Sequence, residues 1–341
     1  MTEHARQLVV PDSRGEGAST SSHVESIDVV IPVLNGMAYL ERTTPTVLAA
    51  ARRAGGVTVN YVDNGSIDGT LVYLESFAHE GVRIHHFRGK SIGGMRNYGA
   101  RVGSADYLSF IDADCAIPER YFEDALSTIQ TTGAAATGCE AHAPDAPHWI
   151  EATWHALHYV GVDRDVHYLN SANFFIQRAA FDRVGGFRED LKTGEDAEIG
   201  QRITEAGLRI RECTRVHAVH FGNPKSIGAF YRRTVWHGLG MFGTVNSRRF
   251  DKPTMMMALH LILTIGGIAS LVLLPLSFGW RVAVAVACQL IAPALTFAHR
   301  ARQTKRVPRI DVALFLYWLY YWARLQALWI VATGRTRLYN K

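Results

Sequence analysis

Two aspartates are the residues whose spacing points most directly to chemistry. Asp112 and Asp114 follow the apolar run at residues 107–111 and are separated by one alanine. A turn at the end of a strand would bring both carboxylates to one side, where they can share a magnesium or manganese ion that in turn binds a diphosphate. The pair can equally be a polar turn in which an aspartate caps the helix expected near residue 118. The pair alone leaves both interpretations open.

Two further polar groups stand earlier in the chain. Asp63 follows the apolar run at residues 57–62, so it can accept hydrogen bonds from a base or a ribose. Arg96 belongs to the glycine-containing segment 93–99, which has neither the spacing of a P-loop nor that of a dinucleotide-binding loop. The glycines of this segment predict that the backbone comes close to a ligand, and Arg96 is expected to bind a phosphate of that ligand.

An acidic group opens a predicted helix in the second half of the chain. Glu195, Asp196 and Glu198 stand at the start of the helical run 199–206. Such a group can complement the dipole of the helix. It can also supply a general base that takes a proton from an acceptor hydroxyl.

The later histidines and arginines have two interpretations each. His220 follows a short apolar run and can complete a metal site or be a structural histidine. Arg232 and Arg233 precede the first long apolar segment and can bind a leaving diphosphate or form a solvated basic face near a membrane. Four residues on one face of a predicted helix suit zinc or, because tryptophans flank them, an acceptor-facing surface: His148, Glu151, His155 and His158.

Alternating apolar runs and helical segments must position these residues. Strands are predicted at residues 27–35, 57–62, 82–87, 107–111 and 216–221, and helices at 39–53, 71–80 and 199–206. This alternation predicts an α/β fold with a mostly parallel, Rossmann-like sheet that has helices on both faces. Ligands of such sheets bind beyond the carboxyl ends of the strands, where the polar groups stand.

Taken in order, the motifs resemble those of family 2 glycosyltransferases with the GT-A nucleotide-sugar-binding fold, over about residues 26–225. The matching set is Ile31-Pro32, Asp63-Asn64-Gly65-Ser66, Arg96-Asn97, Asp112-Ala113-Asp114, Gly185-Gly186-Phe187 and Glu195-Asp196. Each motif is weak by itself, and the ordered set is specific.

The resemblance implies roles for the matching residues in an inverting transfer that depends on magnesium or manganese. Asp63 would contact the base of the donor, and Asp112 would orient the sugar phosphate. The residues expected in the donor site are Pro32, Asn35, Asp63, Arg96 and Asp112. The expected metal ligands are Asp114 and His220, and the expected catalytic base is Asp196. The acceptor or phosphate region would contain Glu195, Arg232 and Arg233.

Two departures from the family pattern refine this expectation. The paired acids of the uridine site are Asp63-Asn64 here, so the nucleotide is expected to be either UDP or GDP. The Gln-x-x-Arg-Trp motif of processive members is absent, because the nearest stretch, residues 231–236, has no glutamine and a different spacing. We therefore expect one sugar to be added per encounter.

The charge distribution points to a membrane and not to nucleic acid. The formal charge of +5 divides into −4 for residues 1–254 and +9 for residues 255–341, where the excess flanks apolar segments. Residues 253–280 and 282–298 contain no charged side chain, and 278–281 suits the turn of a helical hairpin. Basic residues at 300–309 follow directly, which predicts a cytoplasmic loop.

A third apolar stretch, residues 312–332, contains Arg324 and is followed by further basic residues. If this stretch crossed the membrane, the basic residues after it would lie on the outer side, against the rule that basic residues stay on the cytoplasmic side. We therefore favour a helix that lies in the membrane interface. A buried core hairpin is the alternative for all three segments. The four cysteines are scattered without a paired motif, which favours a reduced, cytosolic setting.

The expected organisation is a disordered tail (1–25), a GT-A catalytic domain (26–250) and a membrane region (251–341) with helices near 255–278, 282–299 and 311–333. The expected function is transfer of a sugar from a UDP- or GDP-sugar to a lipid-linked or glycan acceptor, with inversion, at the cytoplasmic face of the cell membrane. The expected partners also include membrane lipids. The alternatives are a polyprenyl-phosphate glycosyltransferase and a non-catalytic nucleotide-sugar-binding scaffold.

Overall fold

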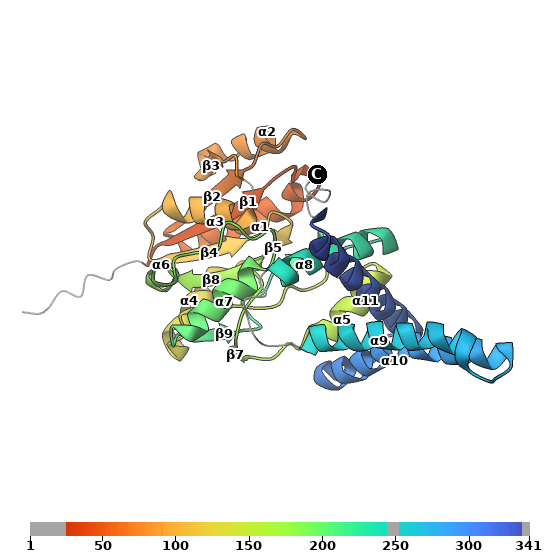
Figure 1. The fold of residues 1–341 in the computed structure, drawn as a ribbon. Coiled ribbons are helices and arrows are strands. Elements are labelled where there is room, and N and C mark those ends of the chain that lie inside the picture. Colours follow the sequence, from red (N-terminus) through yellow and green to blue (C-terminus); the bar gives the residue numbers. More distant parts are fainter. Residues whose placement is uncertain (1–24, 90, 244–251, 336–341) are drawn as a thin grey trace, which may run out of the picture.

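The computed structural model describes residues 25–89, 91–243 and 252–335. Residues 1–24 of the predicted tail and the predicted domain boundary at residue 250 lie outside the described residues. Within them, the central sheet has eight strands in the order β3-β2-β1-β4-β8-β6-β9-β7 (Figure 1). The strands are β1 (Ile27–Val33), β2 (Val57–Asp63), β3 (Val82–His86), β4 (Tyr107–Ile111), β6 (Ala136–Gly138), β7 (Arg164–Val166), β8 (Asn173–Gln177) and β9 (Ile210–Glu212).

The first four strands form the parallel part of the sheet. β1 pairs in parallel with β2 and β4, and β2 pairs in parallel with β3, whereas β8 runs antiparallel to β4. β1 and β4 are fully buried, which is why they read as continuous apolar runs. The mostly parallel sheet predicted from the sequence is confirmed.

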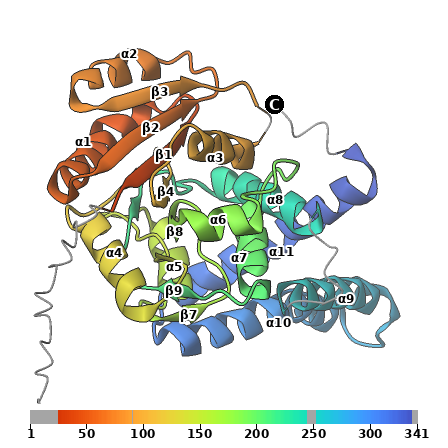
Figure 2. The ribbon, with the colours of Figure 1, turned by 90° about the vertical axis from the view of Figure 1, so that its left-hand side faces the viewer.

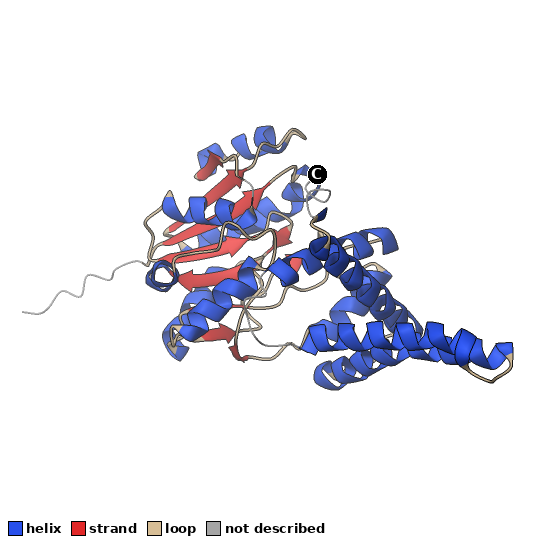
Figure 3. Ribbon diagram, viewed as in Figure 1, coloured by secondary structure: helices blue, strands red, loops and turns tan. Residues whose placement is uncertain are grey.

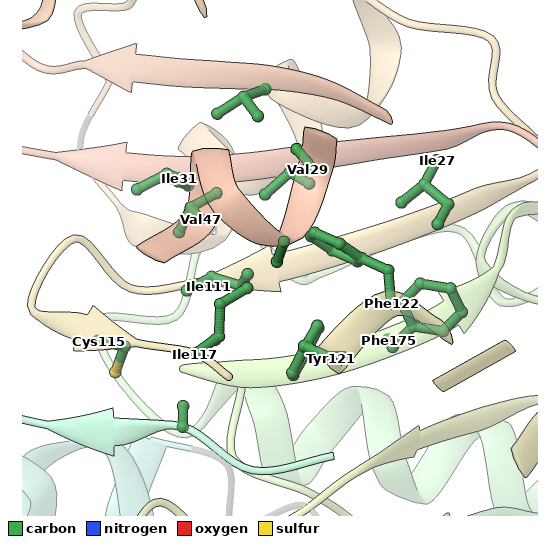
Figure 4. Packing of buried hydrophobic residues seen from close by; sticks show 14 of the residues in the cluster. Ile27, Val29, Ile31, Val47, Ile111, Cys115, Ile117, Tyr121, Phe122 and Phe175 are labelled. Carbon is green, nitrogen blue, oxygen red and sulfur yellow. The ribbon is translucent and has the colours of Figure 1, made fainter. Parts of the chain in front are cut away.

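Helices cover both faces of this sheet (Figures 2 and 3). Alternate residues of β1 point to opposite faces, so Val29 packs with one set of helices and Val30 with the other. The helices on the Val29 side, whose core Figure 4 shows, are α1 (Met37–Ala54) and α4 (Tyr121–Thr132). Those on the Val30 side are α3 (Ile92–Arg101), α6 (Arg178–Val184) and α7 (Glu195–Glu205).

Three predicted elements have different bounds in the structure. The helix expected at 71–80 is divided into α2 (Thr70–Glu75) and the 3₁₀ turn η1 (Ala78–Glu80). The helix expected from residue 199 begins earlier, at Glu195, so its acidic residues lie inside the first turn. The strand expected at 216–221 is the short β10 (Val219–His220), which pairs antiparallel with β5 (Cys115–Ala116).

A group of helices extends from one side of the sheet (Figure 1). It consists of α5 (Trp149–His158), α8 (Ile227–Gly243), α9 (Lys252–Leu273), α10 (Phe278–Thr304) and α11 (Ile310–Ala332). Among the described residues, two segments are long and apolar enough to cross a membrane, Pro253–Leu273 and Phe278–Thr304. Only 28% and 11% of their apolar windows are buried, which disfavours a buried core hairpin.

The turn of the α9–α10 hairpin was misplaced by the sequence analysis. It was expected at 278–281, but those residues form the first turn of α10, and the chain reverses at 274–277. Pro275 has no N–H to continue a helix, so α9 ends before it. The side chain of Arg281 then donates hydrogen bonds to the carbonyl oxygens of Leu276 and Leu271, which closes the turn.

The third apolar helix, α11, is integrated with the catalytic part of the chain. Its buried residue Leu316 packs with Ile150 of α5 and Phe230 of α8, and Ala323 and Ala327 pack with Val235 of α8. On another side, Tyr321 packs with Met257 of α9 and Ala292 of α10. α11 therefore joins the sheet domain to the hairpin, and its position in the membrane interface stays a prediction.

Candidate active site

The site is built at the carboxyl end of β4. The Asp112 N–H donates to the carbonyl oxygen of Ala172 at 3.3 Å, and the Asp112 carbonyl oxygen accepts from the Cys115 N–H at 2.9 Å. These bonds close the turn that carries Asp112 and Asp114. Both carboxylates stay partly open to solvent, at 25% and 24% exposure of the side chain.

The pairing of β5 with β10 brings a histidine to this turn. His220 lies opposite Cys115, and its Nε2 is 3.4 Å from Oδ2 of Asp114. Its Nδ1 is buried and has no hydrogen-bond partner among the described residues. Burial raises the pKa of Asp114, while the opposing charges of His220 and Arg233 limit the rise. A carboxylate and an imidazole at this spacing, in a partly desolvated setting, fit a divalent cation.

Cys115 lies beside these two groups but does not suit the metal. Asp114, Cys115 and His220 have ligand atoms within 4.8 Å of one another in the part of the chain that the structure describes. Burial raises the pKa of the Cys115 thiol well above its ordinary value, so it stays protonated, and it packs in the apolar core. The residues that would hold a divalent cation are therefore Asp114 and His220, with Asp112 beside them.

Arg96 of α3 connects this turn to the start of α7. Its Nη2 donates to Oδ1 of Asp112 at 2.6 Å, and its Nη1 donates to Oε1 of Glu195 at 2.7 Å. Ser171 also donates to Oε1 of Glu195, at 3.2 Å. The guanidinium is 1% exposed. The expectations of a phosphate contact for Arg96 and an acceptor contact for Glu195 therefore need correction, because both groups are buried and hold one another and Asp112.

Asp196 follows Glu195 in the first turn of α7. Burial, aided by the charge of Glu195, raises the pKa of Asp196 to about 6. The carboxylate accepts a hydrogen bond from the Ala197 N–H at 2.7 Å. A carboxylate with this pKa is ionised at neutral pH and is a better proton acceptor than an ordinary aspartate, as a general base requires.

Comparison with known proteins places this geometry in a family. The model of "Glycosyl transferase family 2" matches residues 28–185, and that of "Glycosyl transferase family group 2" matches residues 107–331, about two thirds of the chain. The chain belongs to the family 2 glycosyltransferases.

Curated relatives of this glycosyltransferase are distant. The validoxylamine A glucosyltransferase of Streptomyces hygroscopicus subsp. jinggangensis is 28% identical over 241 residues, which cover 59% of this chain and 57% of that protein. The succinoglycan biosynthesis protein ExoA of Rhizobium meliloti is also 28% identical, over 303 residues that cover 80% of this chain and 81% of that protein. This chain thus matches little more than half of the first relative.

A solved structure supports the GT-A fold of the glycosyltransferase. The mannosyltransferase PcManGT from Pyrobaculum calidifontis, in complex with GDP-Man and Mn2+, superimposes with a TM-score of 0.59 over 89% of this chain and 87% of that one. Because the two sequences are only 17% identical, the likeness concerns the fold alone.

The other residues expected in the donor site lie at or near the carboxyl ends of β1 and β2. Asp63 is 1% exposed, and its carboxylate accepts hydrogen bonds from the N–H groups of Gly65 and Ser66, so it shapes the loop after β2. Asn35, with a φ of 52°, accepts from the Ile67 N–H and is exposed. Pro32 is buried inside β1 opposite Val62, which leaves its side chain no contact with a donor.

The two arginines of α8 in the enzyme differ in position. Arg233 donates from Nη1 to the carbonyl oxygen of Gly222 at 2.8 Å, and its charge acts on Asp114. Arg232, the preceding residue, is exposed, and no hydrogen bond or ion pair among the described residues joins it to Asp114 or His220. The structure thus brings Arg233 to the metal turn and leaves Arg232 on the helix surface.

The predicted zinc face is a structural cluster. His148 and Glu151 form a capping box at the start of α5, and His158 stacks on Trp154 with ring centroids 4.1 Å apart. His155 stacks on Tyr159 at 4.9 Å. Capping and stacking account for these side chains, and the metal-sized group of ligand atoms found among the described residues lies elsewhere, so the structure does not support the zinc alternative.

Sequence reasoning missed two residues of the site. A Cβ on Gly222 would lie 1.8 Å from Oδ2 of Asp114, so only glycine allows the backbone to pass this carboxylate. Ser171 supports Glu195 from the loop before β8. One indication in the sequence that Gly222 belongs to the site is its position two residues after His220. Nothing in the sequence distinguishes Ser171.

Proposed function

We propose that this enzyme transfers one sugar from a UDP- or GDP-sugar to a hydroxyl of a lipid-linked or glycan acceptor, with inversion, at the cytoplasmic face of a membrane. The observation that carries this proposal is the Arg96 bridge. It holds Asp112, which belongs to the metal turn, and Glu195, the neighbour of Asp196, in one fixed arrangement. A donor-side group and a candidate base are thus positioned together before any ligand binds.

On the donor side, Asp114 and His220 would hold magnesium or manganese, with Asp112 beside them. The bound cation would offset the negative charge that develops on the departing nucleoside diphosphate. Arg233 adds a positive charge close to Asp114. Asp63 and Asn35 would act through the loops that they shape at the ends of β1 and β2.

On the acceptor side, Asp196 would take the proton of the attacking hydroxyl. A single displacement with the base on the opposite face of the sugar inverts the anomeric centre, and no second nucleophile is required. The raised pKa of Asp196 supports this role, since it brings the proton affinity of the carboxylate closer to that needed near neutral pH.

The membrane assignment rests on the two apolar helices and their charges. α9 and α10 form an exposed apolar hairpin, and the basic residues after it favour a cytoplasmic loop. A hairpin returns the chain to the side from which it entered, so the catalytic domain (26–250) and that loop would share one side. An acceptor carried by a lipid would then diffuse to the site in the plane of the membrane.

The decisive experiment is a donor screen with the full chain in detergent. Release of UDP or GDP from a panel of nucleotide sugars is measured with Mn²⁺, with Mg²⁺ and with a chelator. Metal-dependent release from at least one donor is expected. Stabilisation by a nucleotide sugar without any release, with all acceptors tested, would instead support a non-catalytic binding scaffold.

The main enzymatic alternative is transfer to a polyprenyl phosphate. That acceptor is already an anion and needs no base, so it would leave Asp196 without a role. Product analysis separates the two: a glycosidic bond to a hydroxyl supports the proposal, and a sugar phosphodiester supports the alternative.

A further inference from the structure

α11 carries a partly buried cation that the proposed mechanism does not use. Asp311 and Arg324 are the only charged residues of this apolar helix. Nε and Nη1 of Arg324 are buried and have no hydrogen-bond partner among the described residues. The guanidinium lies over the ring of Tyr320, 4.9 Å from its centroid. Buried guanidinium nitrogens without a partner are costly, and in a helix close to a membrane they point to a function.

Arg324 lies close to the acceptor side of the site. A Cβ on Gly238 of α8 would be 3.4 Å from Nη1 of Arg324, so α8 approaches this side chain closely. One residue earlier, Nδ1 of His237 is 3.5 Å from Oγ1 of Thr193. Thr193 precedes Asp196 by three residues, and a Cβ on Gly240 of α8 would lie 2.3 Å from Cγ2 of Thr193, so α8 connects this loop to α11.

A second set of contacts supports this position. Tyr168 packs on α7, where a Cβ on Gly200 would lie 2.4 Å from its Cβ. Loss of solvation raises the pKa of Tyr168, and the charges of Asp196 and Tyr320 add to the rise, although this tyrosine is 54% exposed. Tyr168 therefore lies within the electrostatic reach of both groups.

The region is cationic. Burial lowers the pKa of His237 to about 3, and the charges of Arg233 and Arg324 lower it further, so this histidine is neutral at physiological pH. The charges of an arginine on α8 and of one on α11 thus both act on His237, and Nε and Nη1 of Arg324 have no hydrogen-bond partner within the described residues. Such a place favours an anionic ligand.

We propose that Arg324 binds the phosphate of a lipid-linked acceptor and so holds the acceptor hydroxyl near Asp196. The inference rests on the proposed function and names the class of its acceptor. The guanidinium is suited to phosphate because its N–H groups are arranged in a planar fork. The lipid is favoured as the source of the phosphate because α11 also packs on both candidate spans, where Tyr321 contacts Met257 and Ala292.

Binding of farnesyl phosphate to the full chain in detergent tests this proposal. Tryptophan fluorescence is titrated in the presence of Mn²⁺ and saturating UDP, which occupy the donor site. Farnesol and inorganic phosphate are the probes that separate the lipid from the anion. The variants are Arg324→Gln and Arg324→Lys. Arg335→Gln is the matched control, since Arg335 also lies over a ring, that of Trp329, but is exposed beyond the end of α11.

The wild type and Arg335→Gln should bind farnesyl phosphate equally, and Arg324→Gln should bind it at least about tenfold more weakly. Arg324→Lys should bind farnesyl phosphate with an intermediate affinity, and it tests the proposal if Arg324→Gln does not fold. Equal binding by all variants would overturn the proposal. Inorganic phosphate that binds as tightly as farnesyl phosphate would overturn the lipid as its source.

Donor hydrolysis, measured in the same preparations, keeps this test separate from that of the proposed function. The wild type and the control Arg335→Gln should hydrolyse the donor equally. If no donor is hydrolysed but farnesyl phosphate still requires Arg324, the proposed function fails and the phosphate site stands. If hydrolysis is intact but binding ignores Arg324, the phosphate site fails alone.

Discussion

Two arginines, the buried Arg96 and the partly buried Arg324, show how differently the strand-end site and the α8–α11 region are organised. Arg96 has carboxylates on both of its terminal nitrogens, whereas Arg324 has two buried nitrogens without a partner among the described residues. The first region neutralises its charges internally and therefore has a fixed geometry. The second leaves positive charge available to a ligand. The contrast between the two arginines indicates that the strand-end site is preorganised and that the α8–α11 region is completed by a bound substrate.

The largest expected effect is at the metal turn. Asp114→Asn should leave no measurable metal-dependent sugar transfer, because a neutral amide replaces an anionic ligand. Transfer is measured across Mn²⁺ concentrations, and a thermal melt checks the fold. Asp165→Asn, on the surface strand β7, is the control and should be fully active. Full activity of Asp114→Asn at low metal would refute the assignment of the ligand.

Asp196→Asn should reduce sugar transfer by about 10²–10⁴-fold, the range expected for loss of a general base. Affinity for the donor should barely change. Glu198→Gln is the matched control, since Glu198 shares the helix terminus but pairs with Arg202. Glu195→Gln is not a control, because Glu195 bonds to Arg96. Normal transfer by Asp196→Asn would favour an acceptor that is already an anion.

Arg96→Lys tests whether the strand-end site depends on its bridge. A lysine cannot serve both carboxylates with the planar geometry of a guanidinium, so transfer should fall by about 10–100-fold. The melting temperature should also fall, because a buried carboxylate loses its partner. Arg101→Lys, at the exposed end of the same helix, should change neither quantity. An active and equally stable Arg96→Lys variant would show that the bridge is dispensable.

The pH dependence of transfer should show the ionisation of Asp196. The base must be a carboxylate, so the rate should rise through a pKa of about 6 and then level off, and Asp196→Asn should lack this limb. The pKa is raised in the folded state, so its contribution to stability is present below the unfolded pKa and is lost as pH rises through 6. Asp196→Asn should therefore be the more stable protein at pH 8, by about 1–2 kcal/mol. A pH-independent difference in stability between the two proteins would contradict this.

The smallest effect on the chemistry is expected from replacing residues 253–304 with a short linker. Removal of all residues from 255 on would also remove α11 and expose the apolar face of α8. Loss of the hairpin alone should release the protein from membranes and leave donor hydrolysis within about twofold of the wild type. Fractionation in high salt is the measurement. Membrane recovery of the shortened chain would show that α11 is itself an anchor.

The strands and the acidic turn of this protein were predictable because their signals are local. β4 is found at 107–111 as expected, and Asp112-Ala113-Asp114 follows it at the edge where parallel sheets bind ligands. The two longest uncharged segments became the two candidate spans for a similar reason, since uncharged length alone predicts a helix that can cross a bilayer.

The partners of buried charges were decided by tertiary structure. Arg96 reads as a phosphate ligand in the sequence because Asp112 and Glu195 are 16 and 99 residues away, and only the packing of α3 between β4 and α7 brings the three together. His220 reaches Asp114 through the pairing of two very short strands, which carry almost no periodic signal. Arg324 looked like one charge on an interfacial helix until α8 was seen to pack against it. Sequence patterns report the environment of a residue along its own element, whereas the charge that a side chain faces depends on elements that are distant in the chain.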